Sequence, residues 1–197
     1  MHCSGIAQSV GFGAAARGDA RVLVLGSLPG QISLQQGEYY ANPHNAFWKI
    51  MEKLFGAPRD MPYAARLRRL NESGIALWDV CASGQRPGSL DSKLSNIVAN
   101  DFGSFFSSHP SIGLVCFNGA TAAKLYSRKV LPWLADRDAA IRRVVLPSTS
   151  PAHAAMPLER KLNRWREVLL PALEPTLGRY SYSSHQMSRS DADKGGL

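Results

Sequence analysis

The sequence predicts an α/β fold: a three-layer α/β/α sandwich with a central, mainly parallel four-stranded sheet. Four short runs rich in Val, Leu and Ile are typical of buried strands, and segments with helical spacing of apolar residues separate them. In chain order the runs are 21–27, 75–80, 112–118 and 142–148. Strands that alternate with helices form parallel sheets with helices on both faces, which gives the predicted architecture.

Five segments place apolar residues at three- and four-residue spacing, which predicts amphipathic helices. They are 45–55, 61–73, 91–109, 120–134 and 157–174. The last has a Pro at its first turn, a favoured position for that residue. In the second, Arg66, Arg68 and Arg69 are expected to form a solvated face.

Domain organisation follows from composition. The chain has 197 residues with 45% hydrophobic content, enough for one sizeable core. Residues 1–18 are small and Gly-rich, and residues 181–197 lack the apolar side chains needed to offset their ordering entropy. We therefore expect one domain over residues 19–175 between two flexible ends.

Composition also excludes some classes of protein. No apolar run approaches the roughly 20 residues of a membrane span, so we expect a cytoplasmic protein that does not associate with membranes. Cys3, Cys81 and Cys116 have no CxxC spacing, so we expect neither a metal nor another cofactor. A net charge of +8 favours a polyanionic partner such as nucleic acid.

Four segments follow the predicted strands, and we call them the rim loops. They are 26–45, 81–93, 118–120 and 147–157. Loops at the carboxyl ends of parallel strands meet at one edge of the sheet, where ligands of open α/β sheets bind. Three of the four combine Gly, Pro and small hydroxyl residues with few charges. Such loops can bring backbone N–H groups and hydroxyls close to phosphates and bases.

Several common chemistries fit these loops poorly. The segment "GSLPG" has Ser27 in its second position, whereas a serine hydrolase needs Ser at the centre of G-x-S-x-G. The same segment matches neither the P-loop motif nor the dinucleotide-binding motif G-x-G-x-x-G. The carboxylates Glu38, Asp79 and Asp91 form no evident acid–base pair, so we expect a nearly neutral site. A neutral site suits a reaction whose leaving group departs before water attacks, and an amide such as Asn45 can hold that water.

Three segments together carry a family resemblance: "GSLPGQISLQQGEYYANPHNAFWKIM", "FNGATAAKLY" and "LPSTSPAHA". From about residue 10 to about residue 173 the chain resembles the uracil-DNA glycosylase superfamily. It is most similar to the hypoxanthine-DNA (deoxyinosine) glycosylase branch, with the mismatch-specific uracil-DNA glycosylases as near relatives. The resemblance implies a monomeric enzyme that flips a deaminated base out of DNA, hydrolyses its N-glycosidic bond and leaves an abasic site.

The resemblance assigns roles to four residues around the base. Leu28 stands where the mismatch-specific branch has its water-positioning Asn, so that group is missing. The hypoxanthine branch carries its important Asn in the segment that reads N-A-F-W here, which makes Asn45 the implied catalytic residue, although Asn also suits a helix N-cap. Tyr40 corresponds to a ring that stacks on the flipped base, and Asn118 to a base contact, although Asn before Gly also fits a plain turn.

The resemblance also implies DNA contacts in the second and fourth rim loops. Leu146 replaces the catalytic His of the best-known uracil branch, so we expect no His-assisted departure of the base. The hydroxyls of the fourth loop are expected to grip phosphates, and the residues after them to fill the gap left by the flipped nucleotide. The expected DNA-contacting residues are Ser89, Ser148, Thr149, Ser150, Pro151 and His153.

Substrate and activity remain open at this point. Hypoxanthine is favoured, uracil is second and xanthine is third. No Lys lies in the motifs, so a lyase activity is not expected. The alternatives are a G/U mismatch-specific uracil-DNA glycosylase, a non-catalytic nucleic-acid-binding module and a small-molecule hydrolase that uses Ser27.

Overall fold

Four parallel strands form the main sheet of the computed structural model, which describes residues 8–87 and 93–174. In sheet order they are β3 (Ile75–Asp79), β2 (Val22–Gly26), β6 (Leu114–Asn118) and β7 (Arg142–Leu146). Each lies within a predicted run, and every neighbouring pair is parallel. The predicted sheet is therefore confirmed. The strands β2 and β3 are buried over their whole length, which explains their almost continuous apolar sequence.

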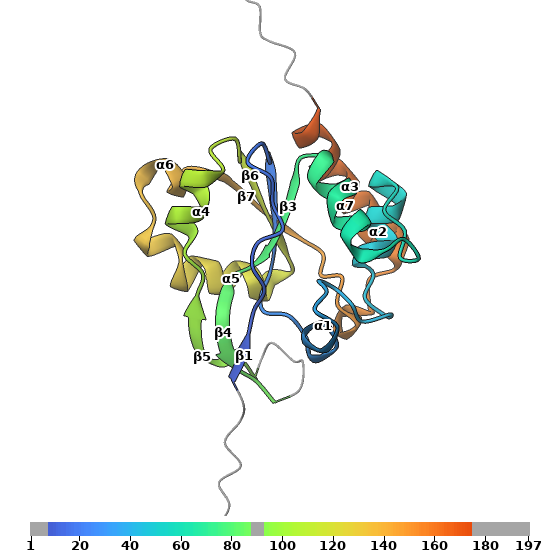
Figure 1. Cartoon of the computed structure of the whole chain (residues 1–197), viewed down its shortest axis with the longest axis horizontal. Coiled ribbons are helices and arrows are strands. Elements are labelled where there is room, and N and C mark those ends of the chain that lie inside the picture. Colours follow the sequence, from blue (N-terminus) through green and yellow to red (C-terminus); the bar gives the residue numbers. More distant parts are fainter. Residues whose placement is uncertain (1–7, 88–92, 175–197) are drawn as a thin grey trace, which may run out of the picture.

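Helices cover both faces of this sheet. Alternate residues of β2 point to opposite faces, Val22 and Val24 to one core cluster and Leu23 and Leu25 to another. The first cluster includes α2 (Phe47–Phe55), α3 (Tyr63–Glu72) and α7 (Leu158–Leu173), and the second includes α4 (Phe102–Ser108) and α5 (Ala120–Lys129). Figure 1 shows the two groups on opposite sides of the sheet, which confirms the three-layer prediction.

Short helices occupy the connections. They are α1 (Gln31–Gln36) after β2, η2 (Leu131–Trp133) and α6 (Asp136–Ala139) before β7, and η3 (Pro151–His153) after β7. Since α1 lies at the lower end of the sheet in Figure 1, the carboxyl ends of the parallel strands point downward there. The rim loops follow from these ends.

A second, antiparallel sheet was not predicted. It consists of β1 (Gln8–Val10), β4 (Cys81–Gln85) and β5 (Ser95–Ala99), in the order β1-β4-β5. The predicted helix over residues 91–109 is therefore wrong for residues 95–99. Its helical part begins after Asp101, whose Oδ1 accepts a hydrogen bond of 3.0 Å from the Ser104 N–H and so caps α4.

The domain begins earlier than predicted. Residues 8–10 pair with β4, and the backbones of Ala15 and Leu77 exchange two hydrogen bonds of 2.9 Å. The boundary expected at residue 19 is therefore corrected for the described residues 8–18, because backbone pairing joins them to both sheets. Residues 1–7 and the expected tail at 176–197 lie outside the described residues.

Two properties of residues 8–87 and 93–174 bear on the class of protein. No helix in these ranges is long and apolar enough to span a membrane. Within the same ranges, no group of three or more His, Cys, Asp or Glu side chains could hold a metal ion.

Candidate active site

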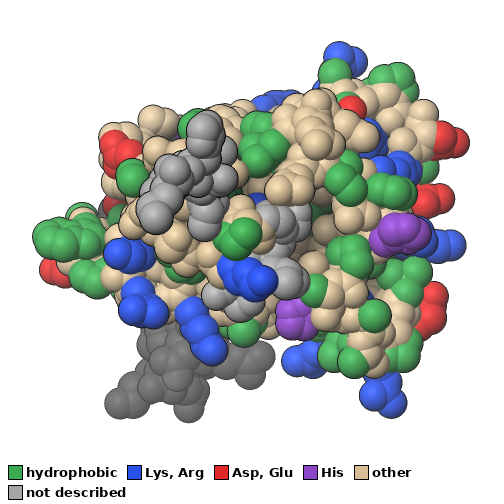
Figure 2. Space-filling view, turned by 90° about the horizontal axis from the view of Figure 1, so that it is seen from below, with side chains coloured by type: hydrophobic (Ala, Val, Ile, Leu, Met, Phe, Trp, Pro, Cys, Tyr) green, Lys and Arg blue, Asp and Glu red, His purple; other side chains and the backbone are tan. Residues whose placement is uncertain are grey.

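One cavity of about 140 Å³ opens among the rim loops. Most of the residues proposed from the sequence line it: Leu28, Tyr40, Asn45, Asn118, Ser148, Ser150 and Pro151. They come from the first, third and fourth rim loops, so the fold brings together residues that lie more than a hundred positions apart. Figure 2 views the molecule from the side of the rim, where most Asp and Glu side chains lie toward the left and right margins.

The remaining proposed residues lie elsewhere. Thr149 is only 1% exposed and does not line the cavity, so the phosphate contact expected for its side chain does not fit the structure. His153 is exposed and lies outside this cavity, in a shallower groove that Ser148 also borders. Ser89 lies outside the described residues.

Asn45 combines a hydrogen bond to the first residue of α2 with a place in the cavity. Its Oδ1 accepts a hydrogen bond of 2.9 Å from the N–H of Phe47, the first residue of α2. Its own N–H donates to the Asn42 carbonyl at 2.9 Å. An amide oxygen has two lone pairs, so the bond to Phe47 is compatible with accepting a second donor from the cavity. The N-cap residue of α2 is Ala46, so Asn45 precedes the cap, and its bond to Phe47 coexists with its place in the cavity.

Tyr40 is held in an unusual backbone conformation. Its φ of 56° lies in the left-handed region, which costs free energy for a non-glycine residue. Its ring stacks on Phe47 with 3.9 Å between centroids and 24° between planes. Phe47 is completely buried, so it gives this ring a fixed support and covers one of its faces. Any flipped base must therefore use the other face.

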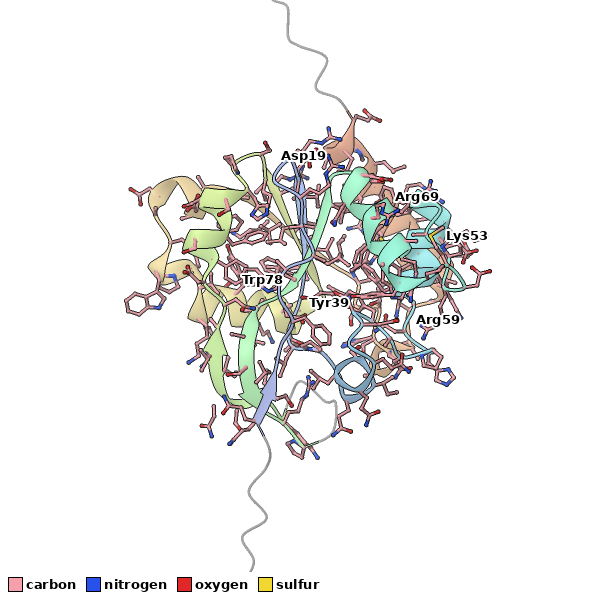
Figure 3. The ribbon with its side chains drawn as sticks, in the orientation of Figure 1. Asp19, Tyr39, Lys53, Arg59, Arg69 and Trp78 are labelled. Carbon is pink, nitrogen blue, oxygen red and sulfur yellow. The ribbon has the colours of Figure 1, made fainter. Side chains whose placement is uncertain are left out.

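The neighbouring residue Tyr39 is fixed on both sides of its backbone. Its N–H donates to the Tyr63 hydroxyl at 2.9 Å, and its carbonyl accepts from the Trp48 indole N–H at 2.9 Å. Its hydroxyl donates to the Gly13 carbonyl at 3.1 Å. Figure 3 shows Tyr39 near the middle of the molecule. Burial, and secondarily the charge of Asp79, raises the pKa of Tyr39 well above its usual value, so the hydroxyl remains a donor. These bonds offset the strain at Tyr40.

Arg66 is buried and stabilises the first rim loop. The prediction that it lies on a solvated helix face is therefore wrong. Arg66 is 5% exposed, forms a 2.9 Å ion pair with Glu38 and lies 4.5 Å from the centre of the Trp48 ring. Its Nε donates to the Met61 carbonyl at 3.1 Å. Arg68 and Arg69 are exposed, as expected.

The third and fourth rim loops are joined by Asn118 and Thr149. The Asn118 Nδ2 donates to the Thr149 hydroxyl at 2.8 Å, and the Thr149 N–H donates to the Asn118 Oδ1 at 2.8 Å. The Thr149 carbonyl in turn accepts from the Ala46 N–H at 2.9 Å, next to Asn45. Thr149 therefore connects the cavity residues of three loops from inside the protein.

Lys161 holds the end of the fourth loop. It is 4% exposed, and its Nζ donates to the His153 carbonyl at 2.9 Å. Burial lowers the pKa of this amine. Since Lys161 lies on α7, this bond ties η3 to a long, packed helix.

The sequence placed Asp79 near the rim but did not predict that Asp79 and Arg86 are buried charges of the cavity lining. Asp79 and Arg86 line the cavity and are 3% and 5% exposed, so the cavity contains one carboxylate and one guanidinium where a nearly neutral lining was expected. Asp79 is the last residue of β3, and Arg86 directly follows β4. The strand-end rule that located the rim loops also located Asp79, whereas the position of Arg86 depends on a strand that was not predicted.

Comparison with protein families gives a direct match at this point. The model of the uracil DNA glycosylase superfamily matches residues 12–174. The chain belongs to this superfamily. It is thus a DNA glycosylase of the superfamily, and its partner is DNA.

Individual relatives agree with this membership. A hypoxanthine DNA glycosylase of Methanosarcina acetivorans is 38% identical over 131 residues, 62% of this chain and 83% of the relative. A hypoxanthine DNA glycosylase of Methanosarcina barkeri is 36% identical over 102 residues, 51% of this chain and 65% of the relative. A solution NMR structure from Methanosarcina acetivorans, provisionally described as a uracil DNA glycosylase, is 33% identical with a TM-score of 0.71, covering 84% of this chain and 99% of its own.

Superfamily membership defines what the cavity must accommodate. A glycosylase cannot reach the glycosidic bond inside a stacked duplex, so it takes the nucleotide out of the helix and into a pocket. The cavity has an aromatic ring in Tyr40, amides in Asn42, Asn45 and Asn118, and hydroxyls in Ser148 and Ser150. A lining of this kind can stack on a base, hydrogen-bond its edge and orient a water molecule.

Proposed function

We propose that this protein is a monofunctional DNA glycosylase that removes hypoxanthine from deoxyinosine and, less efficiently, uracil from deoxyuridine. The observation that carries the proposal is the meeting of Tyr40 and Asn45 in one cavity at the rim of a superfamily fold. The ring provides a stacking surface, and the amide provides a hydrogen-bond acceptor for water. The names of the Methanosarcina relatives support hypoxanthine as the base.

The reaction proceeds through departure of the base. The bond between C1′ and the base nitrogen breaks, and its electron pair leaves with the base. Water held by the Asn45 Oδ1 then adds to the positively charged sugar and releases a proton, which neutralises the departing base. Because C1′ is already strongly electrophilic, the water needs orientation more than deprotonation, and a neutral amide suffices.

Base capture depends on the rigidity of Tyr40. Its stack on Phe47 and the two-sided fixation of Tyr39 keep the ring in place before DNA arrives. A ring that is already ordered loses little entropy when a base stacks on it. Stacking of this kind contributes roughly 1–3 kcal/mol per base and tolerates different bases.

Leu28 argues against the mismatch-specific uracil route as the main activity. It lines the cavity, is 5% exposed and carries no hydrogen-bonding group in its side chain. An enzyme that depends on an amide at this place would lack its water-positioning group here. Slow excision of uracil remains compatible with the proposal, because Asn45 orients water for either base.

Excision from defined duplexes tests the proposal. Oligonucleotides with one deoxyinosine, deoxyuridine or deoxyxanthosine are incubated with excess protein and then treated with alkali, which cleaves abasic sites. We expect strand scission fastest with deoxyinosine and none before alkali. Tight binding without scission of any substrate would instead support a non-catalytic module, and scission only of deoxyuridine opposite guanine would support a mismatch-specific enzyme.

A further inference from the structure

Among the described residues that line the cavity, Arg86 alone carries a positive charge. We propose that its guanidinium stabilises the negative charge that develops on the base as the glycosidic bond breaks, and that Arg86 is therefore a catalytic residue of this enzyme. The inference rests on the proposed glycosylase function and adds the group that assists departure of the base.

Arg86 has a fixed place at the cavity. It is 5% exposed, and its Nη2 donates a hydrogen bond of 2.6 Å to the carbonyl of Pro29, which also lines the cavity. A guanidinium is a rigid plane that carries its N–H donors in fixed directions, so an anchored guanidinium presents them in a fixed orientation. The anchor therefore sets the direction of the whole group.

The strand that leads into Arg86 is paired on both of its edges. Arg86 directly follows Gln85, which pairs with Gln8 of β1 and Ser95 of β5. The second sheet thus carries the guanidinium toward the first rim loop, although the two segments are 57 residues apart. Donors held in place before the reaction stabilise a transition state without a cost for reorganisation.

The chemistry of base departure creates the need for such a group. Heterolysis moves two electrons onto the base nitrogen, and in hypoxanthine the resulting charge spreads over the ring nitrogens and the carbonyl oxygen. Other polar groups of the lining are amides, hydroxyls and the carboxylate of Asp79, none of which is cationic. In a cavity shielded from water, a nearby cation stabilises an anion far more than it does in bulk solvent.

Arg86 keeps its own protons throughout. Its guanidinium does not deprotonate in proteins, so it donates hydrogen bonds and does not act as an acid. The proton that finally neutralises the base comes from the attacking water, whose oxygen bonds to C1′. The sum of the steps is addition of one water across the glycosidic bond, and Arg86 ends in the state in which it began.

The test compares bases that differ in the stability of their anions. Single-turnover excision rates are measured for two pairs of bases, hypoxanthine with 8-azahypoxanthine and uracil with 5-fluorouracil. The two bases of a pair are similar in size, and the second base of each pair leaves as the more stable anion. We expect Arg86→Gln to slow hypoxanthine excision by about a hundredfold or more, the usual effect of removing such a donor. The loss should be at least about tenfold smaller for 8-azahypoxanthine, because that anion needs less assistance.

Two further variants make the comparison specific. Arg59 is a matched control, because it also donates to carbonyls of the first rim loop, those of Ala41 and Asn42, but does not line the cavity. Arg59→Gln should slow both members of a pair by the same factor. Arg86→Lys keeps the charge and should recover part of the rate lost in Arg86→Gln, and it serves as the test variant if the glutamine variant does not fold.

An equal loss for both members of each pair in the Arg86 variants would overturn the inference and leave Arg86 as an anchor of the first rim loop. Absence of any excision by the parent protein would instead contradict the proposed function. The two failures are therefore distinguishable in one set of reactions.

Discussion

A Cβ atom at Gly26 would overlap the Oδ1 atom of Asp79, so the last residue of β2 has no room for a side chain. The same Cβ would lie 3.4 Å from the hydroxyl oxygen of Tyr40. The ends of β2 and β3 and the tip of the Tyr40 ring thus meet at the cavity. Gly26 makes this close approach possible, since its conformation is an ordinary extended one and only its lack of a side chain matters.

Gly26→Ala should therefore damage the cavity. The new methyl group must displace the Asp79 carboxylate and would press on the Tyr40 hydroxyl, and overpacking of this kind costs about 1–3 kcal/mol of stability. We expect slower single-turnover excision together with a lower denaturation midpoint. Gly113→Ala is the matched control, because a Cβ there meets nothing within 4 Å. Equal behaviour of the two variants would show that the cavity adapts to the methyl group.

Arg66 and Arg69 lie on the same helix but should respond differently to replacement by Met. The Arg66→Met variant lacks the 2.9 Å ion pair with Glu38 and the hydrogen bond to the Met61 carbonyl. The partly buried carboxylate of Glu38 is then left without this cation. Loss of such charge-assisted bonds costs about 1–3 kcal/mol. Arg69 is exposed, so its replacement should stay within about 0.5 kcal/mol. Urea unfolding of both variants measures the difference, and similar values would contradict the bracing role of Arg66.

The main sheet could be predicted because three of its four strands, β2, β3 and β6, are buried almost throughout, whereas β7 at its edge is mostly exposed. All five residues of β2 are buried, and such burial requires apolar side chains. A short, continuous apolar run is typical of a strand that is covered on both faces. β4 and β5 lie on a smaller sheet with polar and small residues such as Ser83 and Ser95. β4 pairs with β5 and also with β1, where Gln8 and Ser83 are 75 residues apart, and no local pattern reveals the second pairing.

The candidate site likewise contains some residues that the local sequence identifies and others whose environment depends on distant segments of the chain. Tyr40, Asn45 and Asn118 were identifiable because their segments resemble a family, and the structure places them at one cavity. The burial of Arg66 and Arg86 depends on acceptors 28 and 57 residues away, Glu38 and Pro29. An Arg is exposed in most proteins, so composition and spacing alone predicted the wrong environment for Arg66. Thr149 was misplaced for a related reason, since its partner Asn118 lies on another strand.

Tyr40→Ala should weaken excision through poorer capture of the flipped base. The expected loss is roughly 1–3 kcal/mol in kcat/KM, the value of one stacked base. The loss should be smaller for a mispaired target, because less work is needed to unpair it. Paired and mispaired deoxyinosine substrates measured side by side provide the comparison. Identical losses on both would count against base capture.

Ser148 and Thr149 are neighbours with different predicted roles. Ser148 lines the cavity and is partly exposed, so Ser148→Ala should lower DNA affinity without changing the preferred base. Thr149 is buried and bonded to Asn118, so Thr149→Val should slow excision and leave affinity for undamaged duplex nearly unchanged. Fluorescence anisotropy and excision assays separate the two effects. A larger loss of affinity in Thr149→Val than in Ser148→Ala would reverse these assignments.

Binding to undamaged duplex should depend strongly on salt. The chain carries a net charge of +8, and each phosphate contact contributes about 0.9 to the slope of log affinity against log salt concentration. Titrations at several salt concentrations give the number of phosphate contacts. A slope near zero would show that the rim does not bind the DNA backbone.

The most direct test of the account is single-turnover excision of hypoxanthine by the Asn45→Ala variant, with binding to the same duplex measured in parallel. The account predicts nearly unchanged binding and a rate lower by on the order of a hundredfold or more, because a group that orients the attacking water is lost. Thermal unfolding of the variant reports separately on the lost bond to the Phe47 N–H. Excision close to the parent rate would show that Asn45 only holds the first residue of α2 and would contradict the proposed mechanism.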